Sequence, residues 1–546
     1  MSLKPQAVEP VPQQTQLVAK AAFPKGNLYI KMREELGTIF QDQDFEKLYP
    51  KRGKPGFEPW RLALVTIMQF AENLSDRQAA DAVRARIDWK YALSLELEDS
   101  GFDFSVLSEF RARLIAGESE SLLLDKMLDI FSQKQLLKAR GRQRTDSTHV
   151  LAAIRVMNRL EVITETMRAV LNDLATVAPE WLSSVVPAEW YQRYGKRAEQ
   201  TRLPSAEKAR NEYALTVGQD GVMLIKLLEQ QPDLQKLESV KTLQQMWERH
   251  FARSEMAELI WRKDADLARA ATAIESPYDT QARHSSKHDL VWTGYKVHLT
   301  ETCDPELPRL VTHVHTTVAT TQDVSCTADI QQGLAAKGLL PSRHLVDCGY
   351  VDADLLVSSQ EKYQIELFGP ARYNPSWQAR EGGYDLYQFQ VDWEKQVIKC
   401  PEGKQTIWWG QEKVDSGVVP RIRARFSQKD CAPCASRSKC VRSDAGRARV
   451  LVLQNRAQYE ALRHTRAEMT SEAGRKEYQK RAGIEGSLSE GIRRCGLRRS
   501  RYRGLTKTHL QHVASAAAMD MVRVMNHLQG KPLAPTRVSR FARLAK

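Results

Sequence analysis

The chain has 546 residues, of which 42% are hydrophobic and 27% are charged, a composition typical of a globular protein with several domains and not of a fibrous or disordered one. Its eight cysteines are few for a disulfide-stabilised secreted protein, and no apolar run approaches the roughly 20 residues that span a bilayer. Residues 1–26 are rich in Pro and Gln and lack the apolar segment of a secretory signal, so we expect a disordered tail and a cytoplasmic location.

The net charge of +14 is unevenly distributed along the chain. Residues 421–546 contain 29 Lys and Arg against 9 Asp and Glu, whereas the rest of the chain is slightly acidic. This asymmetry indicates a polyanionic partner for the C-terminal part, and nucleic acid is the most common such partner. A solvated basic surface without a partner is the alternative.

Residues 27–137 have the apolar spacing of several short helices. Pro59 stands at the start of one helical stripe, Ser75 is placed to cap the next helix, and a further helix is expected from Phe104 to Leu114. Short helices with basic faces favour a DNA-binding domain of the helix-turn-helix kind. A helical bundle used for packing or dimerisation explains the same pattern.

Residues 138–151 are expected to form the first part of a catalytic core, since residues 141–150 read as a strand that contains Asp146. Residues 152–275 then show helical spacing, beginning with a stripe from Val156 to Leu174 that keeps the 3–4 period for five turns. This stretch is too long for a loop and predicts a helical insertion.

Strand patterns return in residues 276–370, the expected second part of the core. Two alternating runs are followed by a helix, a short strand that ends in Asp347, a helix capped by Asp352 and a last strand. These predicted elements are residues 292–300, 309–318, 323–337, 344–350 and 365–370. Their order predicts a mixed α/β (α+β) fold, and open sheets of this kind carry their chemistry at strand ends.

Residues 371–457 are rich in Trp, Tyr and Gly and predict a β-rich insertion. They contain Cys400, Cys431, Cys434 and Cys440, with one Cys-x2-Cys pair among them. Four thiolates are the ligands of a structural Zn²⁺ ion, although reduced, buried cysteines are the alternative because the spacing is irregular.

Residues 458–530 are expected to hold the third part of the core with a basic DNA-binding segment, and residues 531–546 a basic tail. Glu485 lies in a helical stretch in which Tyr478, Arg481 and Glu485 are spaced i, i+3 and i+7, so that one helix would carry them on one face. Seven Arg or Lys and no acid follow between Gly491 and Met519. The arginines expected to contact DNA there are Arg493, Arg494, Arg498, Arg499, Arg501 and Arg503.

Three acids therefore stand out by their context, namely Asp146, Asp347 and Glu485. Two strand-borne aspartates and one helix-borne glutamate offer the oxygen ligands that Mg²⁺ prefers, and phosphodiester chemistry uses two such ions about 4 Å apart. Each acid also has an ordinary explanation: Asp146 as a polar strand residue, Asp347 as a turn residue, and Glu485 as the ion-pair partner of Arg481.

Three motifs together resemble the bacterial insertion-sequence DDE transposases with a ribonuclease-H-like core. They are Thr145-Asp146-Ser147-Thr148, Val346-Asp347-Cys348-Gly349-Tyr350 and Tyr478-x2-Arg481-x3-Glu485. The last is similar to the glutamate motif of the group with a Tyr-Arg-Glu-Lys signature. The lysine of that signature is expected seven residues after the glutamate, where this chain has Ile492, so Arg493 or Arg494 would take its role.

The resemblance implies a bacterial, nucleoid-associated enzyme that uses two Mg²⁺ (or Mn²⁺) ions to cut DNA at the terminal inverted repeats of its element. The freed 3′-hydroxyl would then attack target DNA, Tyr478 and Arg481 would contact phosphates near the cut, and a homodimer would bring two DNA ends together. The alternatives are a ribonuclease-H-like DNA nuclease without strand transfer and a non-catalytic DNA-binding protein derived from a transposase.

Overall fold

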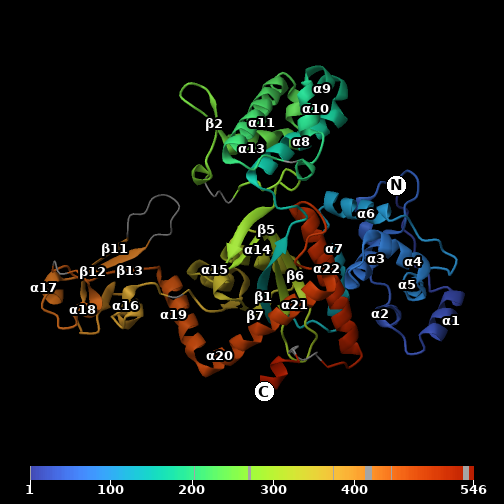
Figure 1. Ribbon diagram of the computed structural model, residues 1–546. Helices are drawn as coiled ribbons and strands as arrows, with labels where there is room; N and C mark the ends of the chain where they lie inside the picture. The colour runs from blue at the N-terminus through green and yellow to red at the C-terminus, as the bar shows by residue number, and fades with distance from the viewer. Residues whose placement is uncertain are drawn as a thin grey trace.

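The computed structural model describes residues 2–201, 203–267, 272–372, 374–411, 421–443, 446–532 and 540–545. A mixed β-sheet lies at the centre, flanked by N-terminal helices on one side, a β-rich part on the other and a helical part above (Figure 1). The predicted mixed α/β class is confirmed. No helix in the described ranges is both long and apolar enough to cross a membrane.

The central sheet has six strands, in the order β4-β5-β1-β7-β8 with β6 also paired to β5. They are β1 (Arg140–Leu151), β4 (Arg283–Lys287), β5 (Leu290–Thr302), β6 (Val311–Val318), β7 (Pro341–Leu345) and β8 (Glu366–Phe368). β1 runs antiparallel to β5 and parallel to β7, and β7 runs parallel to β8. The alternating runs predicted before and after Pro305 are β5 and β6, so both predictions are confirmed.

Helices pack against this sheet. They are α14 (Asp323–Ala336), α15 (Ala353–Tyr363), α21 (Gly483–Cys495) and α22 (Leu505–Leu528). α22 is buried along most of its length because it lies between β6 and the N-terminal helices α3 and α7. Asp352 caps α15 as predicted, since its side chain accepts a hydrogen bond from the Leu355 backbone N–H.

The N-terminal helices share one hydrophobic core with α22, except α1, whose Ala19 lies in a small separate cluster with Ile30 and Tyr91. They are α1 (Gln13–Ala22), α2 (Leu28–Leu36), η1 (Asp42–Leu48), α3 (Pro59–Ala71), α4 (Asp76–Ala85), α5 (Ile87–Ala92), α6 (Ser105–Ala116) and α7 (Leu122–Gln133). The predicted cap at Ser75 is confirmed, because it forms a reciprocal capping box with Gln78.

The structure differs from the expectation of a disordered tail before Asn27. Helix α1 lies there, the Thr15 hydroxyl donates to the Leu95 carbonyl at 2.7 Å, and Ala19 is fully buried. The Pro/Gln-rich composition misled the prediction because this short segment takes its stability from contacts with the helices that follow. Of the expected basic tail, residues 533–539 and 546 lie outside the described residues.

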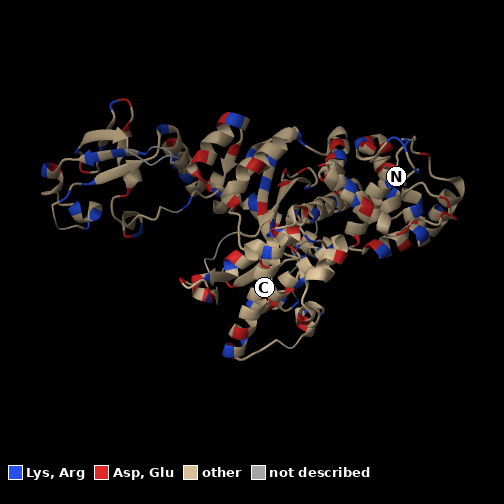
Figure 2. Cartoon of the chain, turned by 90° about the horizontal axis from the view of Figure 1, so that it is seen from above, with Lys and Arg blue, Asp and Glu red and all other residues tan. Residues whose placement is uncertain are grey.

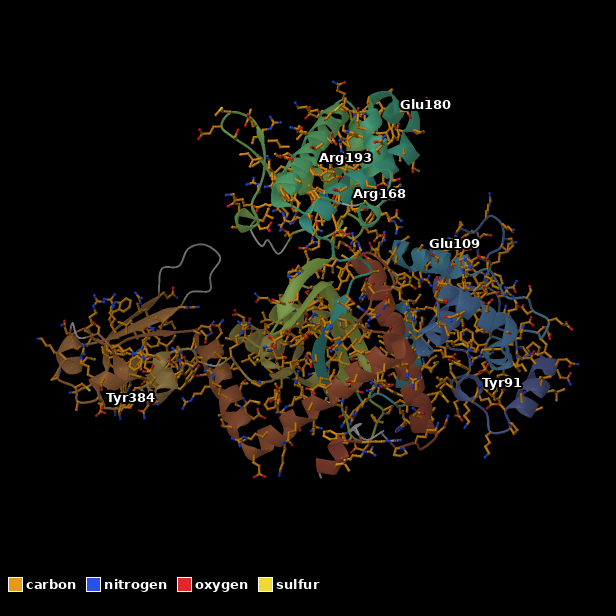
Figure 3. All side chains as sticks on the ribbon, in the orientation of Figure 1. Tyr91, Glu109, Arg168, Glu180, Arg193 and Tyr384 are labelled. Atoms are coloured by element: carbon orange, nitrogen blue, oxygen red, sulfur yellow. The ribbon has the colours of Figure 1, made fainter. Side chains whose placement is uncertain are left out.

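The helical part above the sheet has its own core. Its elements are α8 (Arg159–Val177), α9 (Pro179–Val185), α10 (Ala188–Tyr194), η2 (Ala198–Gln200), α11 (Glu207–Leu228), α12 (Pro232–Gln235), α13 (Glu238–His250), β2 (Phe251–Arg253), β3 (Leu259–Trp261) and η3 (Asp264–Asp266). α8 begins later than the predicted stripe, because Asn158 caps it and leaves Val156 80% exposed. Arg168, which Figure 3 labels, donates to the Tyr278 hydroxyl at 2.8 Å.

The β-rich part consists of small sheets and short helices around a separate core. Its elements are α16 (Trp377–Arg380), η5 (Leu386–Gln388), β9 (Gln390–Asp392), β10 (Val397–Lys399), β11 (Thr406–Gln411), β12 (Ile422–Phe426), α17 (Gln428–Cys431), α18 (Arg437–Cys440) and β13 (Val450–Leu453). Helices α19 (Arg456–Thr470) and α20 (Glu472–Gln479) connect it to the central sheet (Figure 1). Lys and Arg are spread over its strands and loops, at the left of Figure 2.

Candidate active site

Asp146 and Asp347 lie at the same edge of the central sheet. Arg144 of β1 pairs with Leu345 of β7 in a parallel register, so Asp146, inside β1, lies level with Asp347, just beyond the end of β7. Asp146 accepts a hydrogen bond from the Ser147 N–H at 2.8 Å, and Asp347 from the Gly349 N–H at 2.7 Å. These bonds hold both carboxylates close to the backbone.

Arg481 joins the two carboxylates. Its Nη2 lies 2.8 Å from Oδ2 of Asp146 and 3.5 Å from Oδ2 of Asp347, and only 13% of its side chain is exposed. Burial raises the pKa of the Asp146 carboxyl against the opposing effect of Arg481, and the nearby charge of Asp347 raises it further. The two half-buried carboxylates therefore share the positive charge of Arg481.

The helical stretch that carries Arg481 is divided into three pieces. Tyr478 lies near the end of α20, Arg481 in the 3₁₀ turn η6 (Lys480–Ala482), and Glu485 in the first turn of α21. The three elements follow one another without a gap, and Lys480, Ala482 and Gly483 at their junctions have right-handed helical dihedrals, so the stretch stays helical with a 3₁₀ turn in its middle. The Tyr478 ring packs edge-on against Phe368 of β8, with the ring centroids 6.4 Å apart, so Tyr478 is anchored to the same sheet as Asp347.

Glu485 is exposed and makes no hydrogen bond or ion pair within the described residues. Its negative charge nevertheless contributes to the raised pKa of Arg481, after the larger effects of burial, Asp146, Tyr478 and Asp347. Glu485 thus lies near the same guanidinium as the two aspartates but forms no ion pair with it. The alternative explanation, in which Glu485 is the ion-pair partner of Arg481, is therefore not supported.

A buried glutamate that the sequence analysis missed supports this site. Glu301 of β5 has no exposed side-chain area; its Oε1 accepts from Arg144 at 2.5 Å and its Oε2 from Arg523 at 3.0 Å and from Ser487 at 2.5 Å. Burial alone raises the pKa of Glu301, but Arg523 and Arg144 hold it below its ordinary value. The signal in the sequence was weak: an acid at the end of an alternating run.

Arg144 connects this buried pair to the turn that holds Arg481. Its Nη1 donates a hydrogen bond to the carbonyl of Lys480, the residue before Arg481. A Cβ atom on Gly483 would lie 2.2 Å from the same Nη1, so only glycine leaves room for the guanidinium at the start of α21. The Glu301 pair therefore positions the segment that contains Arg481 and Glu485.

The predicted DNA-contacting arginines divide into two groups. Arg493, Arg498, Arg499 and Arg503 are exposed. Arg501, in contrast, donates to the Leu74 carbonyl at 2.6 Å and lies over the Phe70 ring, so it ties this segment to α3. Arg494 is half-buried near Glu490.

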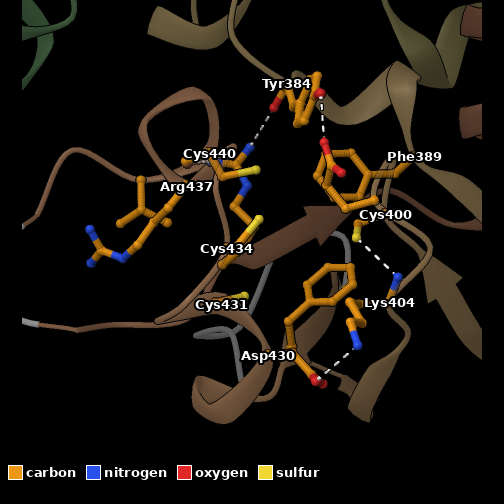
Figure 4. A pocket seen from close by; sticks show the side chains of 13 residues that line it. Tyr384, Phe389, Cys400, Lys404, Asp430, Cys431, Cys434, Arg437 and Cys440 are labelled. Atoms are coloured by element: carbon orange, nitrogen blue, oxygen red, sulfur yellow. Dashed lines mark hydrogen bonds and ion pairs between the residues drawn. The ribbon is translucent and has the colours of Figure 1, made fainter.

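The four cysteines of the β-rich part line one cavity of about 30 Å³ (Figure 4). The Sγ atom of Cys400 accepts a hydrogen bond from the Lys404 N–H at 3.3 Å. Burial raises the pKa of the Cys440 thiol to about 11, and the other three sulfur atoms contribute to that rise. The predicted set of four thus faces a common space, although Cys400 comes from the turn after β10 and the other three from residues 431–440.

Within the described residues, no group of three or more His, Cys, Asp or Glu side chains is placed to hold a metal ion. Beside β1 and β7, Arg481 stands between the two aspartates, and Glu485 is exposed. In the β-rich part, the sulfur atoms share a cavity without being gathered around one point.

Two family models match the chain. The "Transposase DDE domain" matches residues 399–525, which include Arg481, Glu485 and the four cysteines, and the "Transposase domain (DUF772)" matches residues 17–113, the N-terminal helices. Both matches support an insertion-sequence DDE transposase. No curated protein and no solved structure matches this chain. The matched segments leave out Asp146 and Asp347, so the matches do not bear on these two residues.

Proposed function

We propose that this transposase cuts DNA at the ends of its element and joins the freed 3′-hydroxyl groups to target DNA, with Asp146, Asp347 and Glu485 as the catalytic acids. The observation that carries the proposal is the convergence of Asp146 and Asp347, 201 residues apart in the chain, on one guanidinium beside the glutamate motif. The mixed sheet, with Asp146 inside β1 and Asp347 just beyond the end of the neighbouring β7, supports a ribonuclease-H-like core.

The carboxylates fit a divalent metal. Arg481 shows that they already hold a positive charge between them, and their hard oxygen atoms suit Mg²⁺ or Mn²⁺. Asp146, Asp347 and Glu485 would hold two such ions, which would activate the attacking oxygen and stabilise the leaving oxygen of the phosphodiester.

The other residues of the site would bind and orient the DNA. Arg481 can turn its guanidinium from the aspartates to a phosphate oxygen, and Tyr478 lies close enough for the charges of Arg481, Asp347 and Asp146 to act on the pKa of its hydroxyl. The exposed Arg493, Arg498 and Arg499 extend the positive charge along the chain after Glu485 and would contact the backbone of the duplex.

The larger assembly and the domain limits follow from the same proposal. Two DNA ends must be held together for strand transfer, so we infer a homodimer on terminal inverted repeats. The N-terminal helices, residues 27–137, would bind the repeats, and the core would consist of residues 138–151, 276–370 and 458–530.

A strand-transfer experiment tests the proposed reaction. The transposase is mixed with a pre-cut, labelled element end and a supercoiled target plasmid in Mg²⁺ or Mn²⁺. We expect label to enter the plasmid, because the freed 3′-hydroxyl attacks the target. Cleavage of uncut ends without any labelled plasmid would identify a nuclease, and binding without either product would identify a non-catalytic DNA-binding protein.

We also propose that Cys400, Cys431, Cys434 and Cys440 hold a structural Zn²⁺ ion. Four sulfur atoms that line one small cavity match the usual ligand set of such an ion, and they would draw together when it binds. The backbone N–H that points at Cys400 Sγ would stabilise its thiolate form.

Metal analysis of the purified transposase tests the zinc site. We expect about one zinc per chain after dialysis. The double variant Cys431→Ser/Cys434→Ser should lose it, whereas Cys348→Ser, an exposed cysteine outside the cluster, should keep it. Wild-type protein without zinc would contradict the site.

A further inference from the structure

A groove of about 610 Å³ lies between the β-rich part and the central sheet. One wall is β13, and the other is formed by Val351–Ala353 and α19. Only the 3₁₀ turn η4 (Cys348–Tyr350) separates Asp347 from Val351. We call this hollow the strand groove. It begins one turn of chain beyond a candidate catalytic aspartate.

The strand groove is strongly positive. Its charged lining consists of one acid, Asp352, and the arginines Arg372, Arg421, Arg449 and Arg466. The Asp352 carboxylate is already used as the cap of α15, where it accepts from the Leu355 N–H at 2.7 Å. The four arginines of the lining therefore outnumber its single acid, and the lining carries a net positive charge.

Two of these arginines have donors without an acceptor. Nη1 of Arg466 and Nε of Arg449 are buried and have no hydrogen-bond partner within the described residues. Arg466 is otherwise held in place, since its guanidinium lies 4.5 Å over the Tyr387 ring and donates to the Arg372 carbonyl at 3.1 Å. Leaving a charged donor unpaired costs more than leaving a neutral one, so an outside acceptor would stabilise this arrangement.

The same groove also offers apolar and aromatic surface. The alternation of β13 buries Leu451 and Leu453 in the core and leaves Val450 and Val452 39% and 38% exposed. Both valines line the groove, together with Tyr387, whose ring is held between Arg466 and Tyr459. A ligand with negative charge on one side and a flat apolar face on the other would match this lining.

We propose that the strand groove binds an unpaired DNA strand beside the cut, with phosphates on Arg372, Arg421 and Arg466 and a base against Val450 and Val452. Bases in a duplex are stacked and cannot reach such a wall, whereas those of a single strand can. The volume accommodates a ligand of nucleotide size. The inference rests on the proposed DNA cleavage, because cleavage is the step that frees a strand next to Asp347.

Binding measured without divalent metal tests the groove apart from catalysis. A labelled single-stranded oligonucleotide is titrated with wild-type transposase, with Arg372→Glu/Arg421→Glu, and with Arg425→Glu/Arg442→Glu. All four arginines are exposed or nearly so in the β-rich part, and the control pair lies outside the groove. We expect at least tenfold weaker binding for the groove variant and less than threefold for the control.

The salt dependence gives a second measurement. Two lost phosphate contacts should reduce the slope of log affinity against log salt by about 1.4 for a single strand. Photo-crosslinking of an oligonucleotide that carries bromodeoxyuridine should label wild-type protein near Tyr387, which tests the site without any substitution. A mononucleotide that binds as tightly as the strand would reduce the groove to a small anion site and overturn the proposal.

The inference and the proposed function can fail separately. Equal loss of single-strand binding in the groove and control variants, or crosslinks only outside the groove, would reject the strand groove even if the wild type cuts and joins DNA. Strand binding that depends on Arg372 and Arg421 in a protein that does not cleave would leave the groove standing and reject the catalytic proposal.

Discussion

DNA cleavage at the element ends should fall by about 10³-fold or more in each of the variants Asp146→Asn, Asp347→Asn and Glu485→Gln, while DNA binding persists. Each change keeps the size of the side chain and removes one anionic metal ligand. Asp146 and Asp347 share Arg481, and burial already opposes the charge on Asp146. Loss of that charge should therefore leave the thermal stability nearly unchanged and weaken only the chemistry.

The matched control for this series is Glu472→Gln. Glu472 lies in the first turn of α20, is exposed, and its carboxylate is paired with Lys476 at 2.8 Å. We expect its cleavage rate to stay within about threefold of wild type. The measurement is the initial rate on a labelled DNA end in Mg²⁺ and in Mn²⁺, with binding followed by gel shift. Wild-type cleavage by any one of the three acid variants would remove that acid from the site.

Glu301→Gln lowers the stability of the transposase more than any exposed substitution should. The change leaves Arg144 and Arg523 buried without their common counter-charge, which costs about 3–5 kcal/mol. For a core of this size the midpoint of thermal unfolding should fall by roughly 10 °C. Cleavage should fall as well, since Arg144 also holds the Lys480 carbonyl next to Arg481.

The pH dependence of this effect has a definite sign. The pKa of Glu301 lies below its ordinary value in the folded protein, because Arg523 and Arg144 outweigh the effect of burial. Its contribution to stability is therefore complete above the pKa of an unfolded glutamate and is lost as the pH falls through the folded value. Thermal unfolding of wild type and variant from pH 8 downward should show the two midpoints approaching each other in acid. A constant difference at every pH would show that packing, and not charge, explains the loss.

Much of the fold could be predicted because its signals are local. β5 and β6 alternate, α22 repeats with helical spacing, and Ser75 and Asp352 cap helices within three residues of themselves. Errors arose where local composition opposed distant contacts: the segment that holds α1 has the composition of a tail, yet Thr15 and Ala19 are buried against other helices.

The candidate site divides in the same way. The sequence by itself marked Asp146, Asp347 and Glu485 as candidate acids, since each is distinguished by its own neighbours. Only the tertiary structure decided that Asp146 and Asp347 converge on Arg481. It also decided that Glu301 pairs with Arg144, which binds the turn that holds Arg481. The physical reason is that sheet register and buried charge pairs join segments some 200 and more residues apart through space. No local pattern records which distant partner completes such a pair.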